Sequence, residues 1–120
     1  MANSEIILSN QSHPGDSTVE TITSEKFKGD GYYGRSDGLH TVQYTTDGFI
    51  GTIYMQGTLA VDPSDSDWFE LPSTKQITED LDNDTGNDAF IYNFTGNYVW
   101  VRAVIENWTD GAVASILLNH

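Results

Sequence analysis

The sequence predicts an all-β protein, an antiparallel β-sandwich of jelly-roll type with roughly eight strands and at most a short helical turn. Apolar and polar residues alternate with a period of two in several segments, and turn residues separate these segments. No stretch shows the period of a long amphipathic helix. The 120 residues are enough for one folded domain. We predict that residues 31–120 form the sandwich and that residues 1–30 form an N-terminal arm or edge strands.

The N-terminal third contains a short apolar run, Ile6, Ile7 and Leu8, which is typical of an edge strand or a docking arm. Such a segment could add a strand to the sheet of a neighbouring subunit, so these three residues are candidate interface residues. A weaker strand pattern follows at residues 18–22. Glycines at 29, 31, 34 and 38 then predict a loop around Tyr32 and Tyr33.

The strand signal is stronger from His40 onward. Residues 40–45 alternate, and Asp47 with Gly48 predicts a hairpin turn before a second alternating segment at residues 49–59. In that second segment Ile53, Met55 and Leu59 fall on one face, which we expect to be buried.

Residues 62–88 are acidic, with nine of the 18 acids and a single base. Short strands or a helical turn are expected between residues 67 and 78. Asp80, Asp82 and Asp84 occupy every second position and Asp88 follows four residues later, and calcium prefers such oxygen-rich loops. The match to an EF-hand loop is poor, so a solvated acidic turn is favoured over a calcium site, and no other cofactor is expected.

Two apolar runs at the C-terminal end, separated by a polar connector at residues 107–111, predict a second β-hairpin. In the first run Val99, Val101, Ala103 and Ile105 share one face, which we expect in the core. Trp100 and Arg102 lie on the opposite face and are candidate interface residues. The alternative is that a loop of the same chain covers this second face.

Exposed aromatic residues are the usual platforms for sugars, and Tyr32, Tyr33 and Trp108 are candidates for glycan contact. Trp108 falls in the connector of the predicted hairpin, where exposure is expected. For most of the other aromatic residues, packing in the core or at a subunit interface is the favoured alternative.

The motifs that could indicate catalysis fail in their context. Gly34, Ser36 and Gly38 match the nucleophile elbow G-x-S-x-G, but a strand pattern follows where a helix is required. Asp84 begins an Asp-Thr-Gly triplet, but it lies among other acids and amides instead of apolar residues. The chain has no cysteine, and its three histidines are scattered. We therefore expect no enzymatic activity.

The charge balance restricts the partners. A formal net charge of −13, with only five Lys and Arg, disfavours binding to nucleic acids and to anionic membranes. No apolar run reaches the length of a membrane span, and no secretory signal peptide is expected.

Several strand phrases resemble the small β-sandwich virion proteins of tailed bacteriophages that infect cyanobacteria and other aquatic bacteria. These segments are residues 51–59, 67–69, 94–102 and 115–119, and the resemblance runs from about Gly38 to the end, roughly two thirds of the chain. The resemblance implies a non-enzymatic structural protein of the virion, in particular a capsid decoration protein that adheres as a homo-oligomer, with a trimer favoured. It implies major capsid or other virion proteins as partners, and synthesis in the host cytoplasm. Alternatives are a neck or tail component and a carbohydrate-binding module.

Overall fold

The computed structural model describes residues 4–12, 19–29, 31–32, 38–78 and 87–119. These residues form eight strands and two short 3-10 turns, so the prediction of an all-β antiparallel fold is confirmed. The strands are β1 (Ser4–Ser12), β2 (Glu20–Thr23), β3 (Phe27–Lys28), β4 (Leu39–Thr58), β5 (Phe69–Glu70), β6 (Gln76–Thr78), β7 (Asn87–Thr95) and β8 (Trp100–Asn119). The turns are η1 (Asp65–Asp67) and η2 (Pro72–Thr74).

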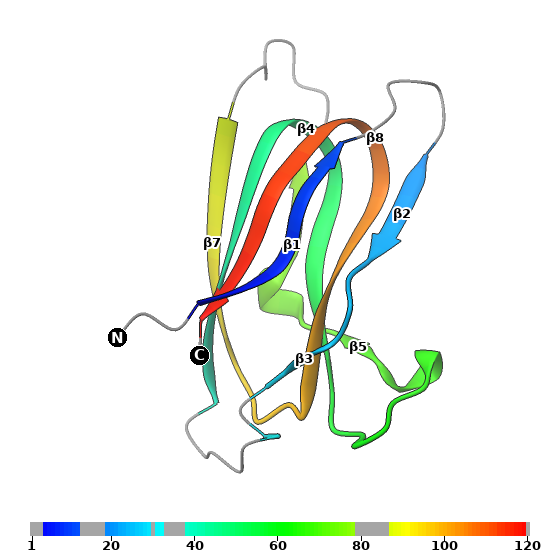
Figure 1. The fold of residues 1–120 in the computed structure, drawn as a ribbon, viewed down its shortest axis with the longest axis vertical. Coiled ribbons are helices and arrows are strands. Elements are labelled where there is room, and N and C mark those ends of the chain that lie inside the picture. Colours follow the sequence, from blue (N-terminus) through cyan, green and yellow to red (C-terminus); the bar gives the residue numbers. More distant parts are fainter. Residues whose placement is uncertain (1–3, 13–18, 30, 33–37, 79–86, 120) are drawn as a thin grey trace.

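Strands β4 and β8 pair with each other in antiparallel fashion from one end to the other. The register runs from Thr41 opposite Asn119 to Thr58 opposite Trp100, with irregularities near residues 45–52. Both strands arch over together at the top of Figure 1. The two hairpins predicted at residues 46–48 and 107–111 are therefore wrong: the chain bends there but stays in the same strand pair. The residues that favour a turn also favour a sharp bend, so the local sequence signal is the same.

Two glycines allow β4 and β8 to bend while their backbones stay in contact. Gly48 and Gly111 both have a positive φ, 63° and 80°. A Cβ on Gly111 would lie 2.1 Å from the carbonyl oxygen of Gly48. The backbones of the two strands thus touch at the bend, where only glycine provides both the conformation and the space.

The bend divides the strand pair into two packed layers. The first layer contains β7, the first half of β4, the second half of β8, and β1. The second layer contains β5 and β6, the second half of β4, the first half of β8, and β2 and β3. The N-terminal segment thus lies within the fold of its own chain. Of the predicted interface residues there, Ile7 is buried, Leu8 is partly buried against the core and Ile6 is exposed.

The hydrophobic core lies between the layers and takes residues from both halves of β4 and β8. Val101, Ala103 and Ile105 are buried, as their shared face predicts, and Val99 is half-buried. Trp108 is also part of the core and only 1% exposed, so its expected exposure is wrong. Because residue 108 continues β8 and does not sit in a hairpin loop, its ring points between the layers and packs near Phe49.

Buried hydrogen bonds around Thr74 link the two halves of β4. The Tyr44 hydroxyl donates to the Thr74 carbonyl oxygen at 2.8 Å, and the Met55 amide donates to Thr74 Oγ1 at 3.0 Å. Thr74 Oγ1 in turn donates to the Leu71 carbonyl at 2.6 Å. Turn η2 therefore ties Tyr44 in the first layer to Met55 in the second.

Alkaline pH should destabilise the fold through Tyr44. Burial raises the pKa of its hydroxyl far above the ordinary value, so the folded chain holds this proton more tightly than the unfolded chain. The contribution of the protonated Tyr44 hydroxyl to the free energy of unfolding is fully present below about pH 10, where tyrosine titrates in an unfolded chain. This contribution is lost as the pH rises further. Urea unfolding at pH 8 and pH 11 should show that the free energy of unfolding falls less between these two pH values in Tyr44→Phe than in the wild type.

Two controls complete this measurement. Burial and Glu106 also raise the pKa of Tyr54, so the loss in Tyr44→Phe should shrink without vanishing. Tyr32→Phe, at an exposed position, should follow the wild type. Identical alkaline losses in the wild type and in Tyr44→Phe would show that Tyr44 does not couple folding to pH.

Candidate functional site

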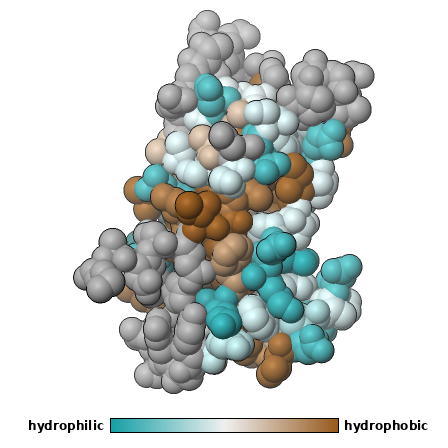
Figure 2. Space-filling view, in the orientation of Figure 1, coloured by the Kyte–Doolittle hydropathy of each residue, from teal (hydrophilic) through white to brown (hydrophobic). Residues whose placement is uncertain are grey.

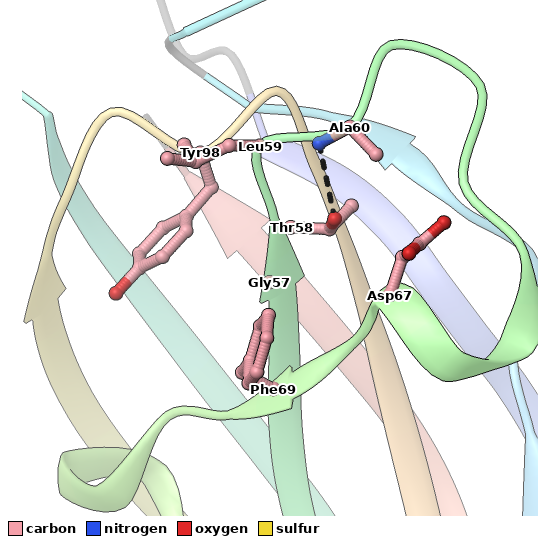
Figure 3. Close-up of a pocket in the computed structure, with 7 residues that line it drawn as sticks. All are labelled: Gly57, Thr58, Leu59, Ala60, Asp67, Phe69 and Tyr98. Carbon is pink, nitrogen blue, oxygen red and sulfur yellow. Dashed lines mark hydrogen bonds between the residues drawn. The ribbon is translucent and has the colours of Figure 1, made fainter.

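A groove of about 380 Å³ opens at the end of the sandwich where β4 finishes. The 3-10 turn η1, strand β5 and the loop between β7 and β8 surround it (Figure 3). Its lining residues are Gly57, Thr58, Leu59, Ala60, Asp67, Phe69 and Tyr98.

Gly57 shapes the groove by having no side chain. It pairs with Phe69 across β4 and β5, so Phe69 projects from the same side of the sheet as Gly57. The Tyr98 ring packs over the glycine, and a Cβ at residue 57 would lie 2.7 Å from Tyr98 Cδ1. The Tyr98 ring therefore covers the side of Gly57 on which a side chain would stand, and Phe69 projects beside it from β5 (Figure 3).

The rim of the groove exposes large apolar side chains. Of the lining residues, Leu59 is 71% exposed and Phe69 68%, and Val61, next to the lining residue Ala60 in the sequence, is 78% exposed. The prediction that Leu59 shares the buried face of Ile53 and Met55 is wrong, because β4 ends at Thr58 and the next residue leaves the sheet. A contiguous exposed apolar patch can mark a contact surface.

Polar groups hold the rim in place. Asp67 Oδ2 accepts hydrogen bonds from the Ser64 amide at 2.8 Å and from Ser64 Oγ at 3.0 Å, which caps turn η1. Thr58 Oγ1 accepts the Ala60 amide at 3.1 Å (Figure 3), and the Thr58 carbonyl accepts the Val99 amide at 2.9 Å. The carboxylate of Asp67 thus has a structural role, and the described lining residues include no second carboxylate or imidazole with which it could act in general acid–base catalysis.

The loop beyond β4 covers the face that carries Trp100 and Arg102. Trp100 Nε1 donates to the Val61 carbonyl at 2.9 Å. The Arg102 guanidinium lies 4.2 Å from the centre of the Trp68 ring, and Arg102 Nε donates to Gln56 Oε1 at 2.7 Å. Residues of the same chain therefore meet both side chains, which is the alternative left open by the sequence.

Tyr32 is the candidate glycan residue that the structure places on the surface. It is exposed, and its ring centre lies 5.0 Å from that of Trp100. Lys28 Nζ lies over the Tyr32 ring and Lys26 Nζ over the Trp100 ring. Trp108 does not join this cluster because it is in the core.

The remaining predicted site residues cannot be placed. Tyr33, Asp80, Asp82 and Asp84 lie outside the described residues, and of Asp88 only the backbone, in β7, is described. Among the residues that the structure does describe, no group of three or more His, Asp or Glu could hold a metal ion. Calcium binding at the acidic loop stays a prediction.

Sequence reasoning missed the groove residues Phe69 and Tyr98. Both lie in segments with strand character, but the alternation of apolar and polar residues gives no sign that β5 places Phe69 close to Tyr98. The available signal was Gly57, a glycine inside an otherwise regular strand, which often marks close approach by another group.

Comparison with known proteins yields a fold and no family. No protein-family model matches the sequence, and no curated protein matches it. A chain from the crystal structure of reduced XRCC1 bound to the DNA polymerase β catalytic domain aligns with a TM-score of 0.55 and 12% identity, over 91% of this chain and 78% of that one. This likeness supports the β-sandwich fold alone.

Two further solved structures are similar at lower scores. A family 29 carbohydrate-binding module from Piromyces equi gives a TM-score of 0.49 with 11% identity, over 99% of this chain and 91% of that one. The K3 adhesin domain of Lys-gingipain from Porphyromonas gingivalis gives 0.49 with 7% identity, over 98% and 73%. The similar structures thus include binding modules, and we transfer no ligand from them. Within the described residues, none of the helical segments has the length and apolar character needed to span a membrane.

Proposed function

We propose that this chain is a non-enzymatic structural protein of a bacteriophage virion, a capsid decoration protein or a component of the neck or tail, which attaches by adhesion. Its partner is the major capsid protein or another virion protein. The surface that we assign to this attachment is the groove between Phe69 and Tyr98 together with its apolar rim.

One observation carries the proposal. Three of the segments that resemble phage virion proteins, residues 51–59, 67–69 and 94–102, are separate in the sequence, and the fold brings all three to this groove. Six of the seven lining residues belong to these phrases, the exception being Ala60. The part of the sequence that carries the resemblance therefore coincides with a largely apolar concave surface.

The chemistry of the rim suits a protein partner. Fully burying a side chain such as Phe, Leu or Val stabilises a contact by about 1.5–3 kcal/mol. Phe69, Leu59 and Val61 expose most of their surface in the free chain, so an interface could gain this energy from each of them. An aromatic residue at the centre of such a patch is the usual energetic anchor.

The attachment test uses virions of the phage that encodes the chain. Particles depleted of the protein are incubated with labelled wild type, with the double variant Leu59→Ser and Phe69→Ser, or with Ile77→Ser, an exposed apolar residue of β6 outside the groove. We expect the wild type and Ile77→Ser to bind alike, and the double variant at least 10-fold more weakly. Absence of the protein from purified virions would refute the proposed function. Equal binding of the wild type, the double variant and Ile77→Ser would show that the groove is not the attachment surface.

A carbohydrate ligand is the second candidate, and a different feature of the groove favours it. The groove is lined by two aromatic rings, those of Phe69 and Tyr98, and aromatic side chains are common in the lining of ligand pockets (Figure 3). Calorimetric titration with a panel of neutral and acidic oligosaccharides, using the wild type and Phe69→Ala, tests this function. Binding that is lost in Phe69→Ala supports it, whereas no heat at millimolar sugar excludes it.

A further inference from the structure

Three basic residues gather on the outer face of the second layer, on the side where β3 lies. Lys28 pairs with Trp100 across β3 and β8, and Arg102 follows Trp100 on the same face of β8. Lys26 Nζ lies 4.8 Å from the centre of the Trp100 ring. The lower half of Figure 2 shows hydrophilic residues over β3 and the segment before it. A chain with a net charge of −13 thus places three of its five Lys and Arg residues together.

The fold fixes two aromatic rings among these cations. The Gly31 amide donates to the Tyr98 carbonyl at 3.0 Å, and a Cβ on Gly31 would lie 2.1 Å from the Asn97 carbonyl oxygen. The backbone after β3 therefore packs directly on the loop between β7 and β8, an approach that only glycine allows. Tyr32, the next residue, thereby stands with its ring centre 5.0 Å from that of Trp100. The Trp100 indole is itself held by its hydrogen bond to the loop after β4.

The two lysines hold their ammonium groups over these rings. Lys28 Nζ lies 4.7 Å from the centre of the Tyr32 ring. Among the acids that the structure describes, none lies within ion-pair distance of Lys28 or Lys26, whereas Arg102 has Asp65 at 4.0 Å. A cation–π contact at an exposed site is weaker than a hydrogen bond between an ammonium group and a carboxylate. The carboxylate of a ligand can therefore draw either ammonium group away from its ring and leave the face of that ring open.

We propose that Lys26, Lys28, Tyr32 and Trp100 bind a sugar residue that carries one carboxylate within an otherwise neutral glycan. The two ammonium groups select an anionic group, and a carboxylate accepts charge-assisted hydrogen bonds from them. The net charge of −13 repels polyanions, which disfavours nucleic acids, acidic peptides and polysaccharides with a charge on every residue. A single carboxylate meets the lysines and avoids most of this repulsion.

The aromatic rings favour a sugar over another small carboxylate. A pyranose ring has an apolar face of C–H groups, and exposed Tyr and Trp rings offer a flat apolar surface on which it can pack. Tyr32 is 44% exposed and Trp100 beside it is half-buried, so both rings reach the solvent. None of the four site residues lines the groove, so this inference does not depend on the attachment surface proposed above.

Calorimetric titration of the whole chain with two matched pairs of sugars tests the proposal. The pairs are sialyllactose with lactose and glucuronoxylotriose with xylotriose, in which the acidic member adds one carboxylate-bearing residue to its neutral partner. We expect at least one acidic sugar to bind at least about 10-fold more tightly than its partner, and more weakly at high salt. The inference is overturned if neither acidic sugar binds at millimolar concentration, if neither pair shows a preference, or if polyglutamate binds more tightly than both acidic sugars.

Four variants locate the site. The double variant Lys26→Gln and Lys28→Gln, and separately Tyr32→Ala, should each weaken binding of the acidic sugar at least about 10-fold. Lys75→Gln is the matched control, because this ammonium group also lies over an aromatic ring but at the other edge of the layer, and it should bind like the wild type. Phe69→Ala, in the groove, should also bind like the wild type. Circular dichroism confirms that each variant is folded. Unchanged binding in the double variant, or an equal loss in Lys75→Gln or Phe69→Ala, places the sugar elsewhere and refutes the proposal.

Discussion

Replacing Gly111 with alanine should destabilise the fold by more than about 3 kcal/mol, a large part of the 5–15 kcal/mol that stabilises a typical domain. Two costs combine. Gly111 has a φ of 80°, a conformation that costs an L-residue about 1–2 kcal/mol. In addition, the new Cβ would lie 2.1 Å from the Gly48 carbonyl oxygen, so the paired strands would have to separate at the bend. Urea unfolding of both proteins gives the difference in free energy.

Gly48→Ala is the matched control for this experiment. Gly48 has a similar φ of 63°, but no atom lies within 4 Å of the position that its Cβ would take. Only the conformational cost of about 1–2 kcal/mol remains. Equal and mild effects of the two variants would mean that the backbones of β4 and β8 do not touch at the bend.

Local signals in the sequence identified the strands but not their continuation through the bends. The alternation of Val101, Ala103 and Ile105 predicted their burial, because side-chain direction in a strand has a period of two. The residues around Gly48 and Gly111 were read as hairpin turns, because a glycine with a positive φ serves a turn and a bend equally well. The pairing of β4 with β8 decides between the two, and it joins residues that are distant in the sequence, from Thr58 with Trp100 to Thr41 with Asn119.

The candidate site was predictable only in part, for a related reason. The phrases that contain Phe69 and Tyr98 were recognised as strand segments, yet their meeting at Gly57 depends on β5 pairing with the end of β4. Arg102 lies over an aromatic ring of its own chain, that of Trp68. The identity of that ring could not be read from alternation along a single strand, because the loop that follows β4 supplies it.

Trp108→Ala should destabilise the fold by about 3–5 kcal/mol, the usual cost of removing a large aromatic residue from a core. The ring is 1% exposed and packs near Phe49, so its removal leaves a cavity between the layers just beyond the bend. Tyr32→Ala, at the exposed aromatic position beside Trp100, should cost less than about 1 kcal/mol. Thermal melting of the two variants measures this difference.

The same pair of variants decides whether Trp108 contacts a ligand. A tryptophan that serves as an exposed sugar platform can be removed without loss of stability, and its removal abolishes binding. A core tryptophan shows the opposite: the melting temperature falls, and any oligosaccharide binding that the wild type shows is kept by the folded fraction of Trp108→Ala. An unchanged melting temperature in Trp108→Ala would contradict the burial of the ring and with it the continuous course of β8.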